Sequence, residues 1–356
     1  MKTDWRVLTA FLLLLTACDP QQPPDTGFAG MGSQAGEFTP VKAGRVFSFP
    51  EDHGPHPGFR IEWWYITATL KDEQGQDFGV QWTLFRNALR PGTPGTGWHD
   101  TTVWLGHAAA TSATRHHVAE RYARGGVGQA GVTLAPFSAW IDDWSLNGET
   151  PNPLTSMQLR ASGKDFRYDL QLTSSKPLVL QGQQGYSQKS DQGQASYYYS
   201  QPFFEASGTL EMDGKSYQVS GHAWLDREWS SQPLTANQTG WDWLSLHLAN
   251  GERLMLYRMR HRKGEPYLSG TWIEADGKAQ SLLASDIDMK PLNETEVAGR
   301  HLPTRWSIRI PGKHLEITTD ALNPKAWMDV SIPYWEGPVK VSGSQSGVGY
   351  LEMTGY

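Results

Sequence analysis

Apolar and polar residues alternate with a period of two in many short stretches of this chain. Residues 78–84 alternate large apolar side chains with glycine, glutamine and threonine, and the pattern recurs at residues 166–172, 216–223 and 306–310. Successive side chains of a β-strand point to opposite faces, so this period predicts strands with one apolar face. No long stretch past residue 40 keeps the 3.6-residue period of a helix. The pattern therefore predicts an all-β protein.

Short turn sequences separate the predicted strands. Asp213-Gly214, Asn250-Gly251 and Asp276-Gly277 each lie between two strand-like runs. Such pairs accept the positive φ angles of tight hairpins, which indicates antiparallel strands in a barrel or a sandwich. We favour the barrel because many strands alternate apolar residues with Trp, Tyr, Gln, His or Arg, as a ligand-holding barrel can. A sandwich is also compatible with the alternation.

Composition narrows the class of protein. The chain has 356 residues, 16 of them Trp, and 38% hydrophobic residues, which is typical of a folded protein. Charged residues make up 19% and the net charge is −6, with no cluster of Lys and Arg. A nucleic-acid partner is therefore not expected. The absence of a glycine-rich phosphate loop also disfavours nucleotide-binding folds.

The N-terminus has the pattern of an export signal. Lys2 and Arg6 precede the apolar run 7–15, which is too short to span a bilayer. The run ends in Leu-Thr-Ala-Cys at residues 15–18, which resembles a bacterial lipobox. We expect a signal peptide at 1–18, with Cys18, the only cysteine, as the lipidated first residue of the mature chain. Residues 19–40 are rich in Pro, Gly and Gln and predict a flexible tether.

The predicted lipoprotein signal indicates where in the cell the protein is expected to be located. A lipidated chain is expected to be anchored in the bacterial cell envelope, on the periplasmic face of a membrane. Asp19, directly after the anchor, favours the inner membrane over the outer one. The membrane is thus an expected partner.

Residues 222–229 carry the strongest candidate chemistry. As one strand, this segment places four side chains on one face: His222, Trp224, Asp226 and Glu228. A carboxyl in an aromatic pocket has a raised pKa and can serve as an acid, and an indole face stabilises a developing cation. The alternative is structural, with Asp226 and Glu228 in ion pairs with Arg227, Arg258 or Arg260. Structural ion pairs are the commoner arrangement.

Two further groups are candidates for binding a ligand. Glu62 and Trp64 share one face of a predicted strand and could line a pocket in a first barrel, or could simply close the barrel, with Arg86 as the partner of Glu62 in either case. Aromatic residues on the later strands 241–247 and 254–260 suit a bulky apolar ligand, although core packing is the alternative. The candidates there are Trp241, Trp243 and Tyr257. The scattered His residues predict no metal site, and no cofactor is expected.

Several motifs together resemble the AttH/CrtC family, whose namesake is carotenoid 1,2-hydratase. They are His56-Pro57, Glu62-Trp63-Trp64-Tyr65, Thr83-Leu84-Phe85-Arg86, Gly221-His222-Ala223-Trp224-Leu225-Asp226-Arg227-Glu228-Trp229, Gly240-Trp241-Asp242-Trp243, Tyr334-Trp335-Glu336-Gly337 and the stretch from Gly349 to Tyr356. The resemblance covers roughly residues 50–356. It implies two tandem lipocalin-like antiparallel β-barrels, which we place at residues 41–231 and 232–356.

The resemblance leaves the function open. Members of the family are described as hydratases or as secreted hydrolases, and some are linked to ABC-transporter permeases. We expect a lipid-anchored protein that binds a bulky apolar or amphipathic small molecule, with such a permease as a candidate partner. The alternatives are a hydro-lyase or isomerase that protonates an alkene through Asp226, and a hydrolase. No nucleophile elbow of the G-x-S-x-G type supports hydrolysis.

Overall fold

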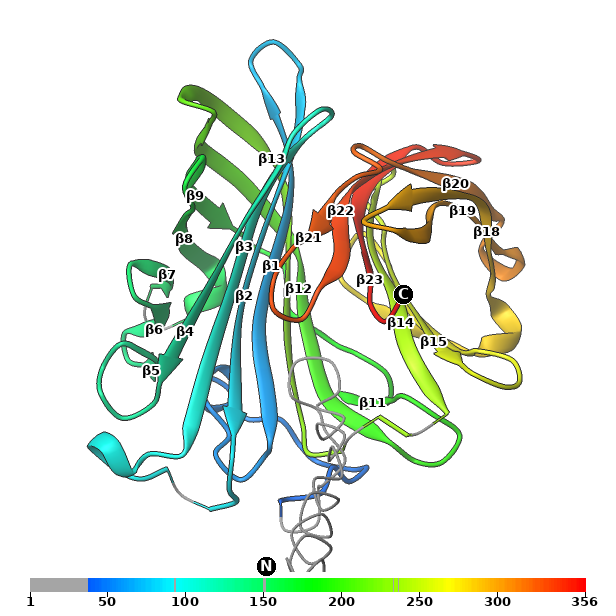
Figure 1. Cartoon of the computed structure of the whole chain (residues 1–356). Coiled ribbons are helices and arrows are strands. Elements are labelled where there is room, and N and C mark those ends of the chain that lie inside the picture. The colour runs from blue at the N-terminus through cyan, green and yellow to red at the C-terminus, as the bar shows by residue number, and fades with distance from the viewer. Residues whose placement is uncertain (1–37, 93, 150–151, 233, 236) are drawn as a thin grey trace, which may run out of the picture.

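The computed structural model describes residues 38–92, 94–149, 152–232, 234–235 and 237–356. Within these residues the chain folds into two curled antiparallel sheets that lie side by side (Figure 1). The helical segments described are five 3₁₀ turns: η2 (Glu51–His53), η3 (Gly97–His99), η4 (Pro153–Thr155), η5 (Ala284–Asp286) and η6 (Pro311–Lys313). The expectation of an all-β protein with two lipocalin-like barrels is confirmed. The predicted signal peptide, Cys18 and most of the tether lie outside the described residues.

The first sheet has thirteen strands and forms a nearly closed barrel. Its main order is β4-β3-β2-β1-β13-β12-β9-β8-β7-β6-β5, and β10 and β11 pair with β12. The strands are β1 (Ile61–Asp72), β2 (Asp77–Ala88), β3 (Thr102–Ser112), β4 (His116–Arg124), β5 (Ala130–Leu134), β6 (Phe137–Ile141), β7 (Trp144–Gly148), β8 (Ser156–Ser162), β9 (Phe166–Thr173), β10 (Val179–Leu180), β11 (Tyr186–Gln188), β12 (Ala195–Met212) and β13 (Lys215–Ser230).

The second sheet has ten strands and curls into a half-barrel. Its main order is β17-β16-β15-β14-β23-β22-β20-β19-β18, and β21 pairs with β22. The strands are β14 (Gln238–Leu248), β15 (Arg253–His261), β16 (Tyr267–Ile273), β17 (Ala279–Leu282), β18 (Asp288–Val297), β19 (Arg300–Ile310), β20 (Leu315–Ala321), β21 (Trp327–Met328), β22 (Tyr334–Gly343) and β23 (Gly347–Met353). Residues 231–237, between β13 and β14, connect the two sheets.

The predicted hairpins form as expected. Asp213 and Gly214 join β12 to β13 with φ angles of 53° and 75°, the left-handed values that a tight two-residue turn requires. Gly251 and Gly277 likewise have positive φ in the turns after β14 and β16. The long β12–β13 hairpin therefore runs the full length of the first barrel.

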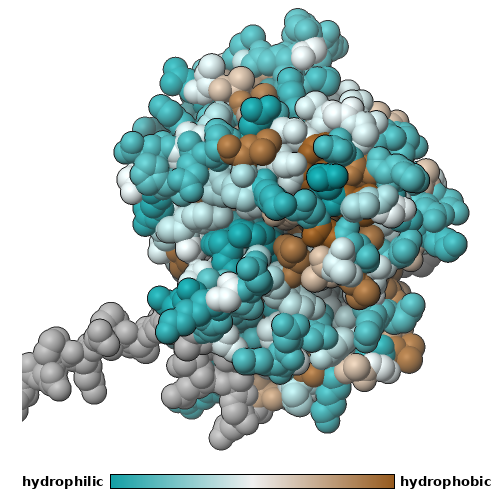
Figure 2. All heavy atoms as spheres, turned by 90° about the vertical axis from the view of Figure 1, so that its right-hand side faces the viewer, coloured by the Kyte–Doolittle hydropathy of each residue, from teal (hydrophilic) through white to brown (hydrophobic). Residues whose placement is uncertain are grey.

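Three layers of apolar side chains hold the molecule together. One fills the first barrel, with Trp64 and Trp82 at its centre, and a second fills the half-barrel around Trp306 and Trp335. The third lies between the two sheets and includes Trp243. Seen from the side of the second sheet, the surface is largely hydrophilic, with apolar atoms gathered in a patch near its middle (Figure 2). Within the part of the chain that the structure describes, no helix has the length and apolar character needed to cross a membrane.

Candidate functional site between the two sheets

A cavity of about 100 Å³ lies between the two sheets. Its walls come from the outward faces of both, because strand residues alternate between the barrel interior and the neighbouring sheet. The polar residues that line it include Asp226, Glu228, Lys189 and Glu352. The aromatic and apolar lining residues are Trp63, Tyr65, Phe85, Tyr198, Trp241, Trp243, Tyr257, Ile61, Leu234 and Met259.

Asp226 lies deep in the first-sheet wall of this cavity and is 3% exposed. Its Oδ1 accepts hydrogen bonds from Trp224 Nε1 at 2.6 Å and from Ser200 Oγ at 2.5 Å, and its Oδ2 accepts one from the Tyr198 hydroxyl at 2.7 Å. Burial raises the pKa of Asp226 to about 7, although these hydrogen bonds oppose the shift and the nearby Glu228 adds to it. Asp226 itself forms no ion pair with a cation among the described residues.

Glu352 lies on the opposite wall, on β23 of the second sheet. Its Oε1 accepts a hydrogen bond from Trp241 Nε1 at 2.6 Å. Burial raises the pKa of Glu352 to about 7. The hydrogen bond from Trp241 lowers this pKa, whereas the charges of Asp226 and Glu228 raise it further. Two carboxyl groups that face one cavity thus each have a pKa raised to about 7.

The third carboxyl group of the cavity has a cationic partner. Glu228 Oε1 lies 2.9 Å from Lys189 Nζ and also accepts a hydrogen bond from the Ser196 hydroxyl. Lys189 Nζ lies 4.4 Å from the ring centroid of Tyr257, within cation–π range. Glu228 and Lys189 therefore form an ion pair beside Asp226 and Glu352, which have no cationic partner among the described residues.

The structural alternative for Asp226 and Glu228 named the wrong partners. Arg258 and Arg260 both pair with Asp242, at 2.7 Å in the case of Arg258. Arg227 points into the first barrel, because it directly follows Asp226 on β13 and neighbouring residues of a strand point to opposite faces of the sheet. The arginines are used elsewhere, and this leaves Asp226 without a counter-ion among the described residues.

Of the other two residues predicted on β13, Trp224 contacts Asp226, whereas His222 lies outside the cavity. Trp224 lies behind Asp226 and holds its carboxyl by a hydrogen bond. His222 is on the same face but four residues away, where it stacks on His247 at 5.4 Å and contacts Glu205. It borders a different hollow and takes no part in the cavity.

The ligand candidates on the second sheet lie in the cavity. Trp241, Trp243 and Tyr257 line it, and Trp243 packs edge-on against Tyr65 at 5.4 Å. Trp243 Nε1 also donates a hydrogen bond to the Tyr198 hydroxyl at 3.2 Å. The second sheet thus supplies aromatic walls to the cavity, whereas the deeply buried Asp226 comes from the first sheet.

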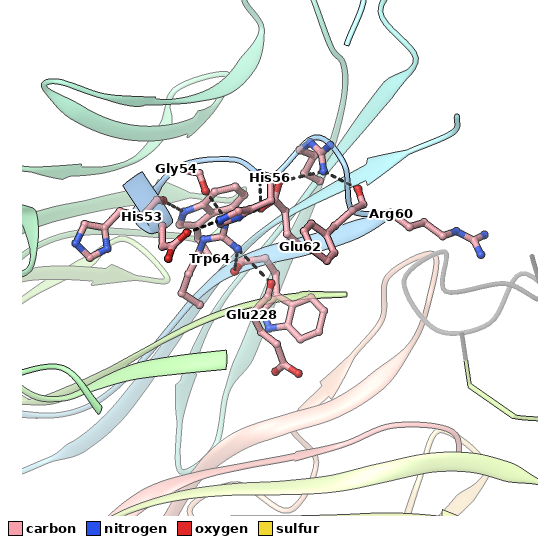
Figure 3. Close-up of polar contacts among 12 residues, drawn as sticks. His53, Gly54, His56, Arg60, Glu62, Trp64 and Glu228 are labelled. Carbon is pink, nitrogen blue, oxygen red and sulfur yellow. Dashed lines mark hydrogen bonds and ion pairs between the residues drawn. The ribbon is translucent and has the colours of Figure 1, made fainter. Parts of the chain in front are cut away.

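The candidates Glu62, Trp64 and Arg86 lie elsewhere, buried inside the first barrel. Figure 3 shows the group around Glu62 and Trp64. Glu62 pairs with Arg86 at 3.0 Å, as expected, and with Arg227. The Arg227 guanidinium stacks 3.8 Å from the Trp64 ring centroid. Burial alone would raise the pKa of Glu62, but Arg227 and Arg86 outweigh it and hold the pKa well below its usual range. This group is a buried ion-pair cluster inside the first barrel, and none of its side chains lines the cavity between the sheets.

Three cavity residues were not singled out from the sequence. Glu352 lies in the closing motif of the family resemblance, and Tyr198 in a run of three tyrosines, but neither has a distinctive local pattern. Lys189 lies in the connection between β11 and β12. The pairing of β12 with β13 places Tyr198 near Asp226, and Lys189 connects two strands of the same first sheet, whereas Glu352 reaches the cavity through the packing of the second sheet against the first.

Comparisons with known proteins agree with this architecture. The model of the AttH-like family matches residues 40–356. The crystal structure of an AttH protein from Nitrosomonas europaea is similar with a TM-score of 0.78 and 32% identity, over 90% of this chain and 100% of that one. Kievitone hydratase from Nectria haematococca shares the fold with a TM-score of 0.66 and 15% identity, over 89% of this chain and 95% of that one. No curated protein matches the sequence.

Proposed function

This protein belongs to the AttH-like family, as its motifs indicated, and we propose that it is an acid–base enzyme of the hydro-lyase type. It would add water to a carbon–carbon double bond of an apolar, unsaturated small molecule. The observation that carries the proposal is that Asp226 and Glu352 line one aromatic cavity, each without a cationic partner in the part of the chain that the structure describes and each with a pKa raised to about 7. The fold shared with a hydratase supports it in outline.

The two acids suit the two proton transfers of hydration. Protonated Asp226, the more deeply buried, donates its proton to one alkene carbon, so that a C–H bond forms as the π bond breaks. The aromatic faces of Trp241 and Trp243 stabilise the cation on the other carbon. Water attacks that carbon and gives its proton to ionised Glu352, which leaves an alcohol. Return of this proton to Asp226 restores the starting state, so the net change is one added water.

The size of the cavity limits what enters it. A buried apolar space of roughly 150 Å³ accepts one benzene ring in another protein. A cavity of about 100 Å³ is therefore suited to one unsaturated group, while the rest of a larger molecule extends through the mouth.

The test is oxygen incorporation from labelled water. We expect the protein, incubated in ¹⁸O-water with kievitone or a carotenoid as probes, to yield a hydrated product that carries the heavy oxygen by mass spectrometry. Glu352→Gln should slow this by at least about 100-fold, the usual contribution of a general base. Glu205→Gln, which changes a carboxyl away from the cavity, should leave the rate unchanged. Product without ¹⁸O, or equal rates for all three proteins, would contradict the proposal.

The second candidate is a binding protein for an apolar ligand, which the sequence analysis placed first. The aromatic walls of the cavity favour it, since they suit retention of an apolar group as well as its reaction. If this is the function, organic extraction of the purified protein should release an intact ligand at close to one per chain, with no change of mass on incubation. A link to a transporter or a lipid anchor at Cys18 is compatible with either candidate.

A further inference from the structure

We propose that one end of the first barrel docks on a lipid bilayer, with the mouth of the cavity directed at the membrane. This is the end at which the described chain enters the fold. The inference deepens the proposed function, because it makes the bilayer the source of the apolar substrate. It rests on where the chain enters the fold, on the position of the cavity mouth and on a group of exposed apolar side chains.

The described chain enters the fold beside the cavity. The Thr39 carbonyl accepts a hydrogen bond from Ser231 Oγ at 2.7 Å, and the neighbouring residues Ser230 and Gln232 line the cavity. The lining residues that are partly exposed include Gln232 and Leu234, in the connection between the sheets, while Asp226 is deep. In Figure 1 the described part of this connection and the loop after β11 lie at the same end of the molecule as the first described residues, which are drawn in blue. The mouth and the entry point therefore share one end.

Exposed apolar side chains lie in the segments 38–60, 89–92 and 94–101, which Figure 1 shows at this same end. Val46, Leu89 and Trp98 are 87%, 66% and 74% exposed. Leu89 directly follows Ala88, whose N–H donates to the Arg60 carbonyl next to the cavity residue Ile61. We call Val46, Leu89 and Trp98 the apolar rim. Large exposed apolar residues that gather at one end of a soluble fold favour an interface, and Trp is typical of the membrane boundary.

The charges beside the apolar rim fit anionic lipid headgroups. Lys42 and Arg90 are exposed in the same segments, and the exposed Arg124, at the end of β4, places its guanidinium 5.8 Å from the Trp98 ring centroid. Among the acids of residues 38–60, Glu51 is exposed, whereas Asp52 is buried against Arg45. Basic groups next to apolar ones are the combination that binds membrane interfaces.

The predicted lipid anchor would not by itself orient the body. Twenty residues lie between Cys18 and Thr39, and a flexible segment of that length has a typical end-to-end distance of about 25 Å. Such a tether keeps the body near the membrane but lets it turn freely. The apolar rim would supply the missing orientation.

The experiment uses the processed chain, residues 18–356, which contains every described strand. Cys18→Ser makes it cysteine-free, so that a single polarity-sensitive dye can be placed at His99→Cys beside Trp98, or at Ser285→Cys on the second sheet as a matched control. With vesicles of phosphatidylethanolamine and phosphatidylglycerol, we expect a blue shift for the dye at position 99 and none at 285. An equal shift at both positions, or none at 99, would overturn the proposal.

A second measurement, made without a dye, checks that vesicle binding itself depends on the apolar rim. The double variant Leu89→Ser/Trp98→Ser should lower vesicle binding in a flotation assay by at least about tenfold. Leu283→Ser/Leu292→Ser, which removes exposed apolar residues from the second sheet, should change it little. Asp226→Asn should bind vesicles like the parent, so loss of docking and loss of the proposed chemistry are separable. Equal loss in both double variants would contradict a specific docking end.

Discussion

Asp226→Asn is expected to abolish hydration while making the folded protein more stable above neutral pH. Asn has the shape and hydrogen-bonding pattern of the protonated acid. Its carbonyl can accept from Trp224 and Ser200, and its amide can donate to the Tyr198 oxygen. It cannot transfer a proton to an alkene, so turnover should fall by at least about 100-fold.

The gain in stability follows from the sign of the pKa shift. The pKa of Asp226 is raised from 3.8 to about 7 on folding, so the folded state binds the proton more tightly than the unfolded state. The wild type therefore loses stability as pH rises from about 4 to 7, and above that range the penalty is on the order of 4 kcal/mol. The Asn variant has no such penalty. We expect similar unfolding free energies near pH 4 and a clear advantage for the variant at pH 8.

Urea unfolding of both proteins across this pH range is the measurement. Asp320→Asn is the control, because it removes an exposed carboxyl paired with Arg305 and should leave the pH profile unchanged. A variant that is less stable than the wild type at pH 8 would mean that Asp226 is held as a structural anion. Full activity in the variant would exclude it as the proton donor.

The sequence predicted the strands and their faces because both are local properties. A period of two places Asp226 and Glu228 on one face of β13 and Arg227 on the other, and the structure agrees. What lies opposite a face is set by contacts distant in sequence. The sequence therefore did not indicate that Glu352, more than 120 residues later, completes the site.

The same limit explains the candidates that lie outside the cavity. His222 shares the face of Asp226, but four residues of a strand span roughly 13 Å, which carries it beyond the cavity. Glu62 and Trp64 have a motif as distinctive as that of Asp226, yet their face points into a filled barrel. A buried charge in a pattern indicates that a partner exists, and only the fold shows whether that partner is an arginine or a substrate.

Glu62→Gln is expected to produce a large loss of stability. Glu62 and its two partners, Arg86 and Arg227, are almost completely buried, and both guanidinium groups share the single carboxylate as their counter-ion. Its oxygens also accept from the His56 backbone N–H at 2.9 and 3.0 Å, which fixes the segment before β1. Removing the charge leaves two buried cations without a counter-ion, and such a change costs about 3–5 kcal/mol.

Equilibrium urea unfolding at neutral pH measures this loss. Glu316→Gln is the matched control, because Glu316 is exposed, lies 3.9 Å from Arg309 and should contribute less than about 1 kcal/mol. A triple variant, Glu62→Leu/Arg86→Met/Arg227→Met, removes all three charges together and should be less destabilised than Glu62→Gln alone. If the triple variant is the less stable of the two, hydrogen bonds and the Trp64 stack contribute more than charge balance. If Glu62→Gln costs no more than the control, the ion-pair cluster does not stabilise the first barrel.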